Sequence, residues 1–298
     1  TDLGELLIQL AGDKPSHLVY PSIHIPREEA AKLISKLTGR SLPPDVKAIV
    51  RAVRRHMREI FFKADAGISG ANAISADTGT VFIIENEGNA GLTTGLPWKH
   101  LVIAGLEKIV PTIHDALSQT LVTMRYAGFK SSSYIRLING PSKTGDIENL
   151  VVTGVHGPGE YHLILLDNGR TKMAEDPEYK QALLCIRCGL CLFECPVYQV
   201  TNGSFGHIYM GGIGAALTRH LLGGLKPASL LAYTCTLCGR CKQYCPMKID
   251  IPEIILKIRR EAASQKLTPR KITENIEKLT SPNNQPPHQH TYKHKHQA

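Results

Sequence analysis

CIRCGLCLFECP at residues 185–196 and CTLCGRCKQYCP at residues 235–246 decide how the C-terminal part of this sequence folds. Both stretches place four cysteines at the same intervals, and a proline directly follows the fourth. The eight cysteines of the chain are Cys185, Cys188, Cys191, Cys195, Cys235, Cys238, Cys241 and Cys245. Two residues between cysteines let a tight turn aim successive sulfurs at one centre, so the repeated pattern predicts two copies of one metal-binding loop.

The spacing within each run indicates which metal is bound. Soft thiolates select zinc or iron–sulfur clusters, and this spacing is the one by which bacterial ferredoxins hold two [4Fe–4S] clusters. The fourth cysteine of each run then serves the other cluster, which predicts the ligand sets Cys185, Cys188, Cys191 and Cys245, and Cys235, Cys238, Cys241 and Cys195. Structural zinc normally takes two separated cysteine pairs, and disulfides do not persist in a reducing compartment. We therefore predict two [4Fe–4S] clusters as cofactors.

Other residues within the runs bear on this prediction. Gly189 and Gly239 follow the second cysteine of each run and let the backbone stay close to a cluster. Arg187, Arg240 and Lys242 also lie in these loops. They either offset the negative charge of the clusters or are ordinary surface charges, and the sequence leaves both interpretations open.

Composition sets the wider class of protein. The 298 residues allow two domains, and the apolar runs fall far short of the ~20 residues that a membrane span needs. A net charge of +9 permits an acidic partner, but the basic helix face at Arg51, Arg54, Arg55 and Arg58 has no interleaved aromatic residues, so we expect no nucleic acid. We expect a cytoplasmic protein that contacts a membrane only through partners.

The first 170 residues contain no cysteine and alternate helical with strand patterns, which predicts an α/β layer. Apolar periodicity predicts a helix after Pro26 that Gly39 ends, a longer helix over residues 46–61, and a helix that Thr112 caps. Runs of β-branched and other apolar residues predict strands at residues 81–84, 101–104, 151–155 and 161–166.

A second domain is expected to begin near Thr171. Asp176 and Pro177 predict the start of a helix that carries the first cysteines, and apolar spacing predicts an amphipathic helix over residues 254–262. The predicted organisation is an α/β domain over residues 1–170, an α-helical two-cluster domain over 171–265, and a short helix with a disordered tail over 266–298 that is rich in histidine and lysine.

The segment Glu85-Asn86-Glu87-Gly88-Asn89 follows a predicted strand directly, and polar residues at strand ends often build ligand sites in open α/β sheets. A solvated turn is the alternative interpretation. Motifs for dinucleotide, phosphate-loop or serine-hydrolase chemistry do not occur in the sequence, so Glu85 and Glu87 are the candidates for a catalytic nucleophile or base.

Several stretches of the sequence resemble the LUD domain of the lactate-utilisation protein B family, and the resemblance extends through both cysteine runs to about residue 260. The stretches are 2–5, 15–17, 67–72, 76–79, 85–89, 92–94, 101–111, 140–142, 154–158 and 165–170. The resemblance implies an α/β domain similar to the ribose-phosphate isomerase and CoA-transferase fold, followed by a mainly helical two-cluster ferredoxin domain.

The resemblance also implies a role in oxidising L-lactate to pyruvate, with a Cys-rich protein and a second LUD protein as partners. Lactate gives up two electrons and each cluster accepts one, so a flavin-bearing redox partner is a further expectation. The sequence departs from the family at Gly211-Gly212-Ile213-Gly214, where the family tends to have Gly-Pro-Ile-Gly. It also begins where that family is already inside its α/β domain, so we expect an N-terminal portion to be absent or on another chain.

Three functions are compatible with these features. The first is an electron-transfer subunit of a lactate-oxidising complex. The second is a LUD domain that is itself catalytic, in the manner of a CoA transferase, through Glu85 or Glu87. The third is a LUD scaffold that docks the ferredoxin domain onto another redox enzyme.

Overall fold

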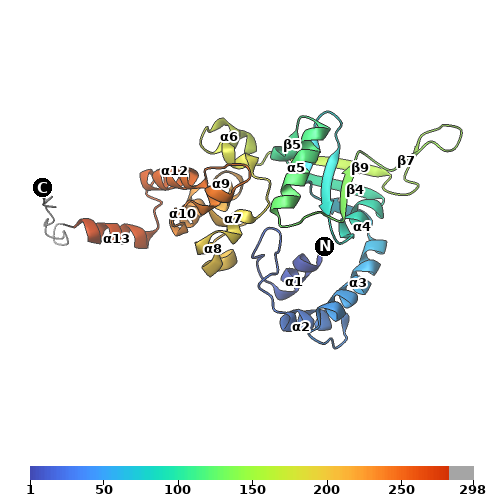
Figure 1. The fold of residues 1–298 in the computed structure, drawn as a ribbon, viewed down its shortest axis with the longest axis horizontal. Coiled ribbons are helices and arrows are strands. Elements are labelled where there is room, and N and C mark those ends of the chain that lie inside the picture. Colours follow the sequence, from blue (N-terminus) through green and yellow to red (C-terminus); the bar gives the residue numbers. More distant parts are fainter. Residues whose placement is uncertain (282–298) are drawn as a thin grey trace, which may run out of the picture.

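The computed structural model describes residues 1–281, and the predicted histidine-rich tail lies outside these residues. A region of helices and three small sheets comes first along the chain, and a helical region that holds every cysteine follows it (Figure 1). The predicted order, a mixed α/β region and then a mainly helical cysteine-rich region, is therefore confirmed.

Three N-terminal helices form a small apolar core of their own. They are α1 (Leu3–Ala11), α2 (Arg27–Thr38) and α3 (Val46–Lys63). Gly39 ends α2 in left-handed backbone, as predicted, and the Asp45 side chain caps α3 by accepting from the Ala48 amide at 2.8 Å. The packed faces of α2 and α3 contribute Ile34 and Val53.

The next region contains two main sheets, besides a two-stranded sheet at its periphery. A parallel sheet has the order β1-β4-β9, and a mixed sheet has the order β5-β2-β3-β6. The strands are β1 (Ala66–Ser69), β2 (Ala73–Ser75), β3 (Val81–Glu85), β4 (Lys99–Gly105), β5 (Ile109–Val110), β6 (Tyr134–Ile138) and β9 (Glu160–Leu166). Parallel strands put their carboxyl ends at one edge, so the segments that follow Ser69, Gly105 and Leu166 leave the first sheet on the same side.

Two helices and one 3₁₀ turn complete this region. They are α4 (Asn89–Gly95), α5 (Ile113–Tyr126) and η1 (Leu106–Lys108), and α5 packs on β2 and β3. Thr112 caps α5 as predicted, because its hydroxyl accepts from the Asp115 amide while the Asp115 carboxylate accepts from the Thr112 amide.

The cysteine-rich region is built from short helices around one apolar core that includes Leu192, Ile213 and Ile254. Its elements are α6 (Arg170–Glu175), η2 (Lys180–Leu184), α7 (Leu190–Phe193), α8 (Pro196–Thr201), η3 (Asn202–Ser204), α9 (Gly211–Leu217), the π-helical turn η4 (Thr218–Leu222), α10 (Leu225–Thr234), α11 (Arg240–Tyr244) and α12 (Ile251–Ser264). The predicted amphipathic helix is α12, which packs against α9 and α10.

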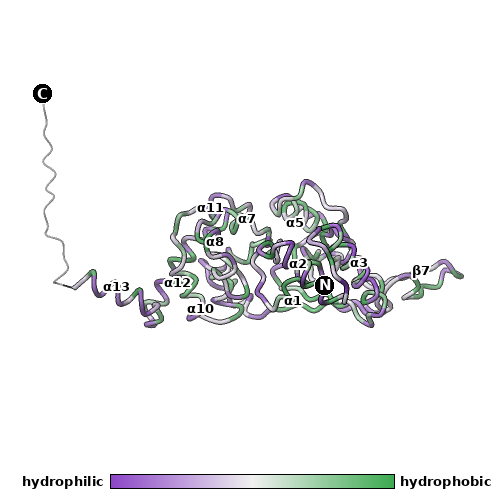
Figure 2. The backbone as a smooth tube through the Cα atoms, turned by 90° about the horizontal axis from the view of Figure 1, so that it is seen from below, coloured by the Kyte–Doolittle hydropathy of each residue, from purple (hydrophilic) through white to green (hydrophobic). Residues whose placement is uncertain are grey.

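Two elements project from opposite ends of the molecule in both views (Figures 1 and 2). One is helix α13 (Arg270–Thr280), and the other is the hairpin of β7 (Lys143–Thr144) and β8 (Val152–Thr153). Across residues 1–281, no helix combines the length and apolar character that crossing a bilayer requires.

Two local predictions were wrong. The strand predicted over 151–155 is only the two-residue β8, which pairs with β7 outside both main sheets. The helix expected after Asp176 does not carry the first cysteines, because a 3₁₀ turn ends at Leu184 and Cys185 begins a loop. The left-handed backbone of Arg187 and Gly189 in this loop prevents a helix from continuing.

Candidate metal centre

The first cysteine run forms a loop between η2 and α7. Cys185 ends η2 in extended backbone, and Arg187 and Gly189 are left-handed, with φ of 64° and 78°. Gly189 is also the N-cap of α7, which carries Cys191. The chain therefore turns twice within five residues, and these turns bring Cys185 and Cys188 of the loop close to Cys191 at the start of α7.

The second run repeats this backbone geometry. Leu237 and Gly239 are left-handed, with φ of 57° and 79°, and Gly239 is the N-cap of α11. Leu237 thus stands where Arg187 stands in the first run. Because two loops of different sequence share these angles, the cysteine spacing and not the intervening side chains sets the shape of each loop.

The fourth cysteines follow α7 and α11. Cys195 is the N-cap of α8, whose first residue is Pro196, and Cys245 ends α11. Both have extended backbone, with ψ of 117° and 119°. Since α7 and α11 pack against each other, each fourth cysteine enters the neighbourhood of the other run.

One cavity collects cysteines from both runs. Its lining includes Cys195, Cys235, Cys238 and Cys241, together with Cys191. The first four are the ligand set that the ferredoxin rule assigns to the second cluster. Residues that lie far apart in the sequence therefore line one space.

The thiols of the first run have a neighbour from the second run. Burial raises the pKa of Cys188, and the nearby sulfurs of Cys185 and Cys245 raise it further. Burial likewise raises the pKa of Cys191 well above its ordinary value, and Cys245 is again among the neighbouring sulfurs. Cys245 is thus close enough to interact with Cys188 and Cys191.

The reciprocal relationship holds for the second run. Burial raises the pKa of Cys235, and Cys195 adds to the effect. The pKa of Cys241 rises to about 12, first through burial and then through the sulfurs of Cys235 and Cys195. Thiols crowded in this way ionise only if cations stand among them, which the iron of a cluster provides. The donor set therefore fits iron–sulfur clusters.

The described thiols do not converge on a single ion. Between residues 1 and 281, no group of three or more His, Cys, Asp or Glu side chains could hold one metal ion. A tetrahedral zinc site needs every sulfur about 2.3 Å from the metal. The two loops also differ in depth, since Cys188 is buried and Cys238 is exposed.

The N-terminal segment before α2 contacts the first loop. Buried His17 lies 3.3 Å from the Gly189 carbonyl oxygen through Nε2, and its ring centroid is 4.2 Å from that of Phe193. The Tyr198 hydroxyl donates to the Ser16 carbonyl oxygen. The α/β region therefore holds the cysteine loop through buried contacts.

A second contact between the two regions is ionic. Glu107, which follows β4, pairs with Arg170 and also with Arg187 of the first loop, whose Nη2 lies 3.2 Å from Oε1. The sequence analysis did not select Glu107 or Arg170 as site residues. The signal that could have found them is their position directly after two strands of one parallel sheet.

The two candidate catalytic carboxylates have different surroundings. Glu85 is the last residue of β3, is fully buried, pairs with Arg136, and accepts from the Gly91 amide at 2.7 Å. Glu87 lies by a cavity of about 370 Å³ that Met57 and Phe61 also line. Its pKa rises to about 8 through a hydrogen bond with Asp2 and through burial. The two side chains therefore do not form one site.

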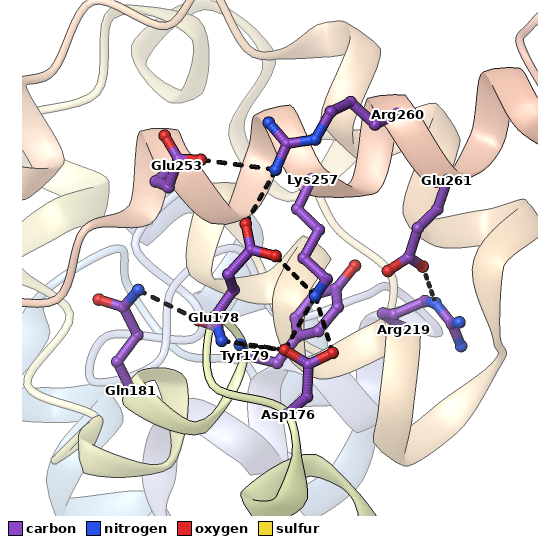
Figure 3. Close-up of polar contacts among 9 residues, drawn as sticks. All are labelled: Asp176, Glu178, Tyr179, Gln181, Arg219, Glu253, Lys257, Arg260 and Glu261. Carbon is purple, nitrogen blue, oxygen red and sulfur yellow. Dashed lines mark hydrogen bonds and ion pairs between the residues drawn. The ribbon is translucent and has the colours of Figure 1, made fainter.

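An ion-pair network ties α12 to the segment that precedes the first loop (Figure 3). Lys257 Nζ lies 2.8 Å from Asp176 and 2.7 Å from Glu178, and it lies over the Tyr179 ring at 5.0 Å. Arg260 extends the network by pairing with Glu178 at 2.8 Å. These pairs fix the entry to the loop against the helix that supports the core.

Family models match most of the chain. A LUD domain model matches residues 1–166, and a 4Fe-4S dicluster domain model matches residues 181–249. The dicluster match, together with the eight cysteines, supports two [4Fe–4S] clusters as the cofactors.

Similar curated proteins share this pair of regions. The uncharacterized electron transport protein YkgF of Escherichia coli is 36% identical over 96% of this chain and 58% of its own length. Lactate utilization protein B of Shouchella clausii is 38% identical over 91% of this chain and 55% of its own length. The protein of the same name from Geobacillus kaustophilus is 37% identical over 87% of this chain and 53% of its own length. The chain spans just over half the length of the curated relatives it matches.

Proposed function

The chain belongs to the LUD-domain family, and from this premise we propose that it is an iron–sulfur electron-transfer subunit of a complex that oxidises L-lactate to pyruvate. The observation that carries the proposal is the pair of equivalent cysteine loops, each with the fourth cysteine of the other as a neighbour. In this proposal Cys185, Cys188, Cys191 and Cys245 hold one cluster, and Cys235, Cys238, Cys241 and Cys195 hold the other.

Each cluster supplies one-electron redox chemistry, while the polypeptide holds and insulates the two centres. Oxidation of lactate to pyruvate releases two electrons and two protons. A flavin-bearing partner or another subunit must therefore accept the electron pair and pass the electrons on singly. Because Cys238 is the exposed cysteine, electrons exchange with a partner protein most directly at the cluster of the second run.

The proposal includes an organisation and a location for the chain. Separate apolar cores on the two sides of residue 170 support a LUD-type α/β domain over 1–170 and a cluster domain over 171–265, and the remaining segment is 266–298. The partners are other lactate-utilisation subunits, namely a Cys-rich protein and a second LUD protein. A cytoplasmic location, where thiols stay reduced, suits eight free cysteines.

Anaerobic reduction by lactate tests this function. The clusters of the purified complex should be reduced by L-lactate, which EPR detects, whereas the isolated chain should stay oxidised until dithionite is added. Oxidation of lactate by the isolated chain would contradict the subunit role. Clusters that dithionite reduces but that lactate does not reduce in any complex would contradict lactate as the electron source.

A catalytic role for the LUD domain is the second candidate, and one observation favours it. Glu87 has a pKa of about 8, so it stays protonated at neutral pH beside an apolar cavity and could serve as a general acid. Glu85 is committed to Arg136 and the Gly91 amide, which leaves it less free to act as a nucleophile. Loss of turnover in Glu87→Gln with full iron content would support this candidate.

A further inference from the structure

A group of charged side chains stands where the parallel sheet meets the first cysteine loop. Glu107 and Lys108 follow the end of β4, and Arg170 follows β9, so these three residues share the carboxyl edge of the sheet. Arg187 reaches them from its place between Cys185 and Cys188. The loop that carries the first run is therefore covered by charges from the α/β region.

The geometry of this group is tightly determined. The Glu107 side chain is only 5% exposed, and it pairs with Arg170 and Arg187 together. The Arg187 guanidinium lies over the Tyr209 ring at 4.5 Å, while its Nη1 is buried without a hydrogen-bond partner among residues 1–281. A side chain at Gly105 would overlap Glu107 and Arg170, so this glycine makes room for the pair.

The charges in the group do not cancel. One carboxylate, Glu107, faces Arg170 and Arg187, and a third cation, Lys108, follows it in the sequence. Burial and the charge of Arg187 lower the pKa of Lys108, whereas the sulfur of Cys185 and the Glu107 carboxylate raise it. Excess positive charge therefore stands, largely desolvated, beside a cysteine of the first run.

We propose that the charges of Lys108 and Arg187 raise the reduction potential of the cluster on the first run. This inference rests on the ligand sets of the proposed function. A cubane with four thiolates carries a total charge of about −2 and reaches about −3 when it takes up one electron. A nearby buried cation stabilises the more negative state, and so it favours reduction.

The second run has a cation of its own, and it comes from α12: Arg259 lies over the Tyr233 ring at 5.2 Å and donates to the Cys235 carbonyl oxygen at 2.6 Å. Leu237 replaces Arg187 at the matching position. The cations beside it are already paired, since Arg240 lies 3.5 Å from Glu194 and Lys242 pairs with Asp250. The charges at the sheet edge therefore act on the first run, and Arg259 is the corresponding cation beside the second.

Redox titration of the full chain, monitored by EPR, tests the inference. Lys108→Met and Arg187→Gln should each lower one of the two midpoint potentials and leave the other in place. Glu107→Gln removes the opposing charge and should shift that same midpoint upward. Opposite shifts are the signature of an electrostatic effect, because a merely structural disturbance has no reason to follow the sign of the charge.

Two matched variants serve as controls. Lys99→Met removes one cation at the other end of β4, where the side chain is 52% exposed, and should leave both midpoints unchanged. Arg187→Lys keeps the charge and should restore most of the wild-type potential. If Arg187→Gln cannot bind iron, Lys108→Met still decides the matter, because Lys108 lies outside the cysteine loop.

Unchanged midpoints in both Lys108→Met and Arg187→Gln would overturn the inference while leaving the clusters intact. So would shifts of one sign in Lys108→Met and Glu107→Gln. A wild-type chain without any iron–sulfur signal would instead overturn the proposed function, so the two failures are distinguishable.

Discussion

Arg187 and Leu237 occupy the same position in the two cysteine loops, and both have left-handed backbone, with φ of 64° and 57°. Neither residue type favours this conformation, which costs roughly 1–2 kcal/mol. In the second loop the Leu237 amide lies 3.4 Å from Cys235 Sγ as a donor. Amides that face a thiolate stabilise its charge, so the conformation suits loops that surround a cluster.

The assignment of each fourth cysteine to the cluster of the other run can be tested directly. In a chain whose second run is disabled by Cys235→Ala, Cys238→Ala and Cys241→Ala, one cluster should remain on the first run. Adding Cys245→Ala should remove that cluster, because Cys245 neighbours Cys188 and Cys191. Adding Cys195→Ala should leave it in place, as iron analysis and EPR would show. The reverse outcome would mean that each run uses its own fourth cysteine.

The two loop glycines should differ in their tolerance to substitution. Both are left-handed, so alanine at either costs about 1–2 kcal/mol. A Cβ at Gly189 would also stand 2.6 Å from His17 Cε1, whereas at Gly239 nothing lies within 4 Å. Gly189→Ala should therefore lower the free energy of unfolding by about 1–3 kcal/mol more than Gly239→Ala does. Anaerobic denaturant titration measures this difference, and equal losses would argue against the contact of His17 with the loop.

Glu85→Gln should act on stability. The buried carboxylate holds Arg136 and the Gly91 amide, and its loss leaves the guanidinium without its ionic partner. We expect the free energy of unfolding to fall by about 1–3 kcal/mol, with iron content unchanged. Arg136→Gln is the matched variant and should cost a similar amount. Full stability with lost turnover in Glu85→Gln would instead show that Glu85 acts in catalysis.

Neighbouring cations on α12 should contribute unequally to stability. Lys257 is 15% exposed and pairs with two carboxylates, while Arg260 is 58% exposed (Figure 3). Lys257→Met should lower the free energy of unfolding by about 1–3 kcal/mol, and Arg260→Met by less than about 1 kcal/mol. Thermal unfolding at low and high salt would show a difference between the variants that persists in salt. A larger loss for Arg260→Met would contradict the buried role of Lys257.

Local signals made much of the fold predictable. Gly39 and Thr112 mark helix ends through their own backbone and hydroxyl chemistry, so α2 and α5 could be predicted without tertiary information. Sheet partners could not be predicted in this way. The strand that ends at Glu85 pairs antiparallel with Tyr134–Ile138 and does not join the parallel sheet of β1, β4 and β9, because strand pairing depends on contacts between distant segments.

The same distinction applies to the metal centre. The cysteine spacing is local, and it predicts both loops and the cofactor. The contacts of His17 with Gly189, and of Glu107 with Arg187, join segments at least eighty residues apart, so no local pattern reveals them. Because these contacts are buried, the polar groups of His17 and Glu107 interact with the loop more strongly than they would in water.

Iron and acid-labile sulfide analysis of anaerobically purified protein, combined with EPR after reduction by dithionite, tests the central claim most directly. Two [4Fe–4S] clusters predict about eight iron and eight sulfide per chain, with signals typical of reduced cubanes. A colourless protein that contains zinc, or that contains no metal, would contradict the account.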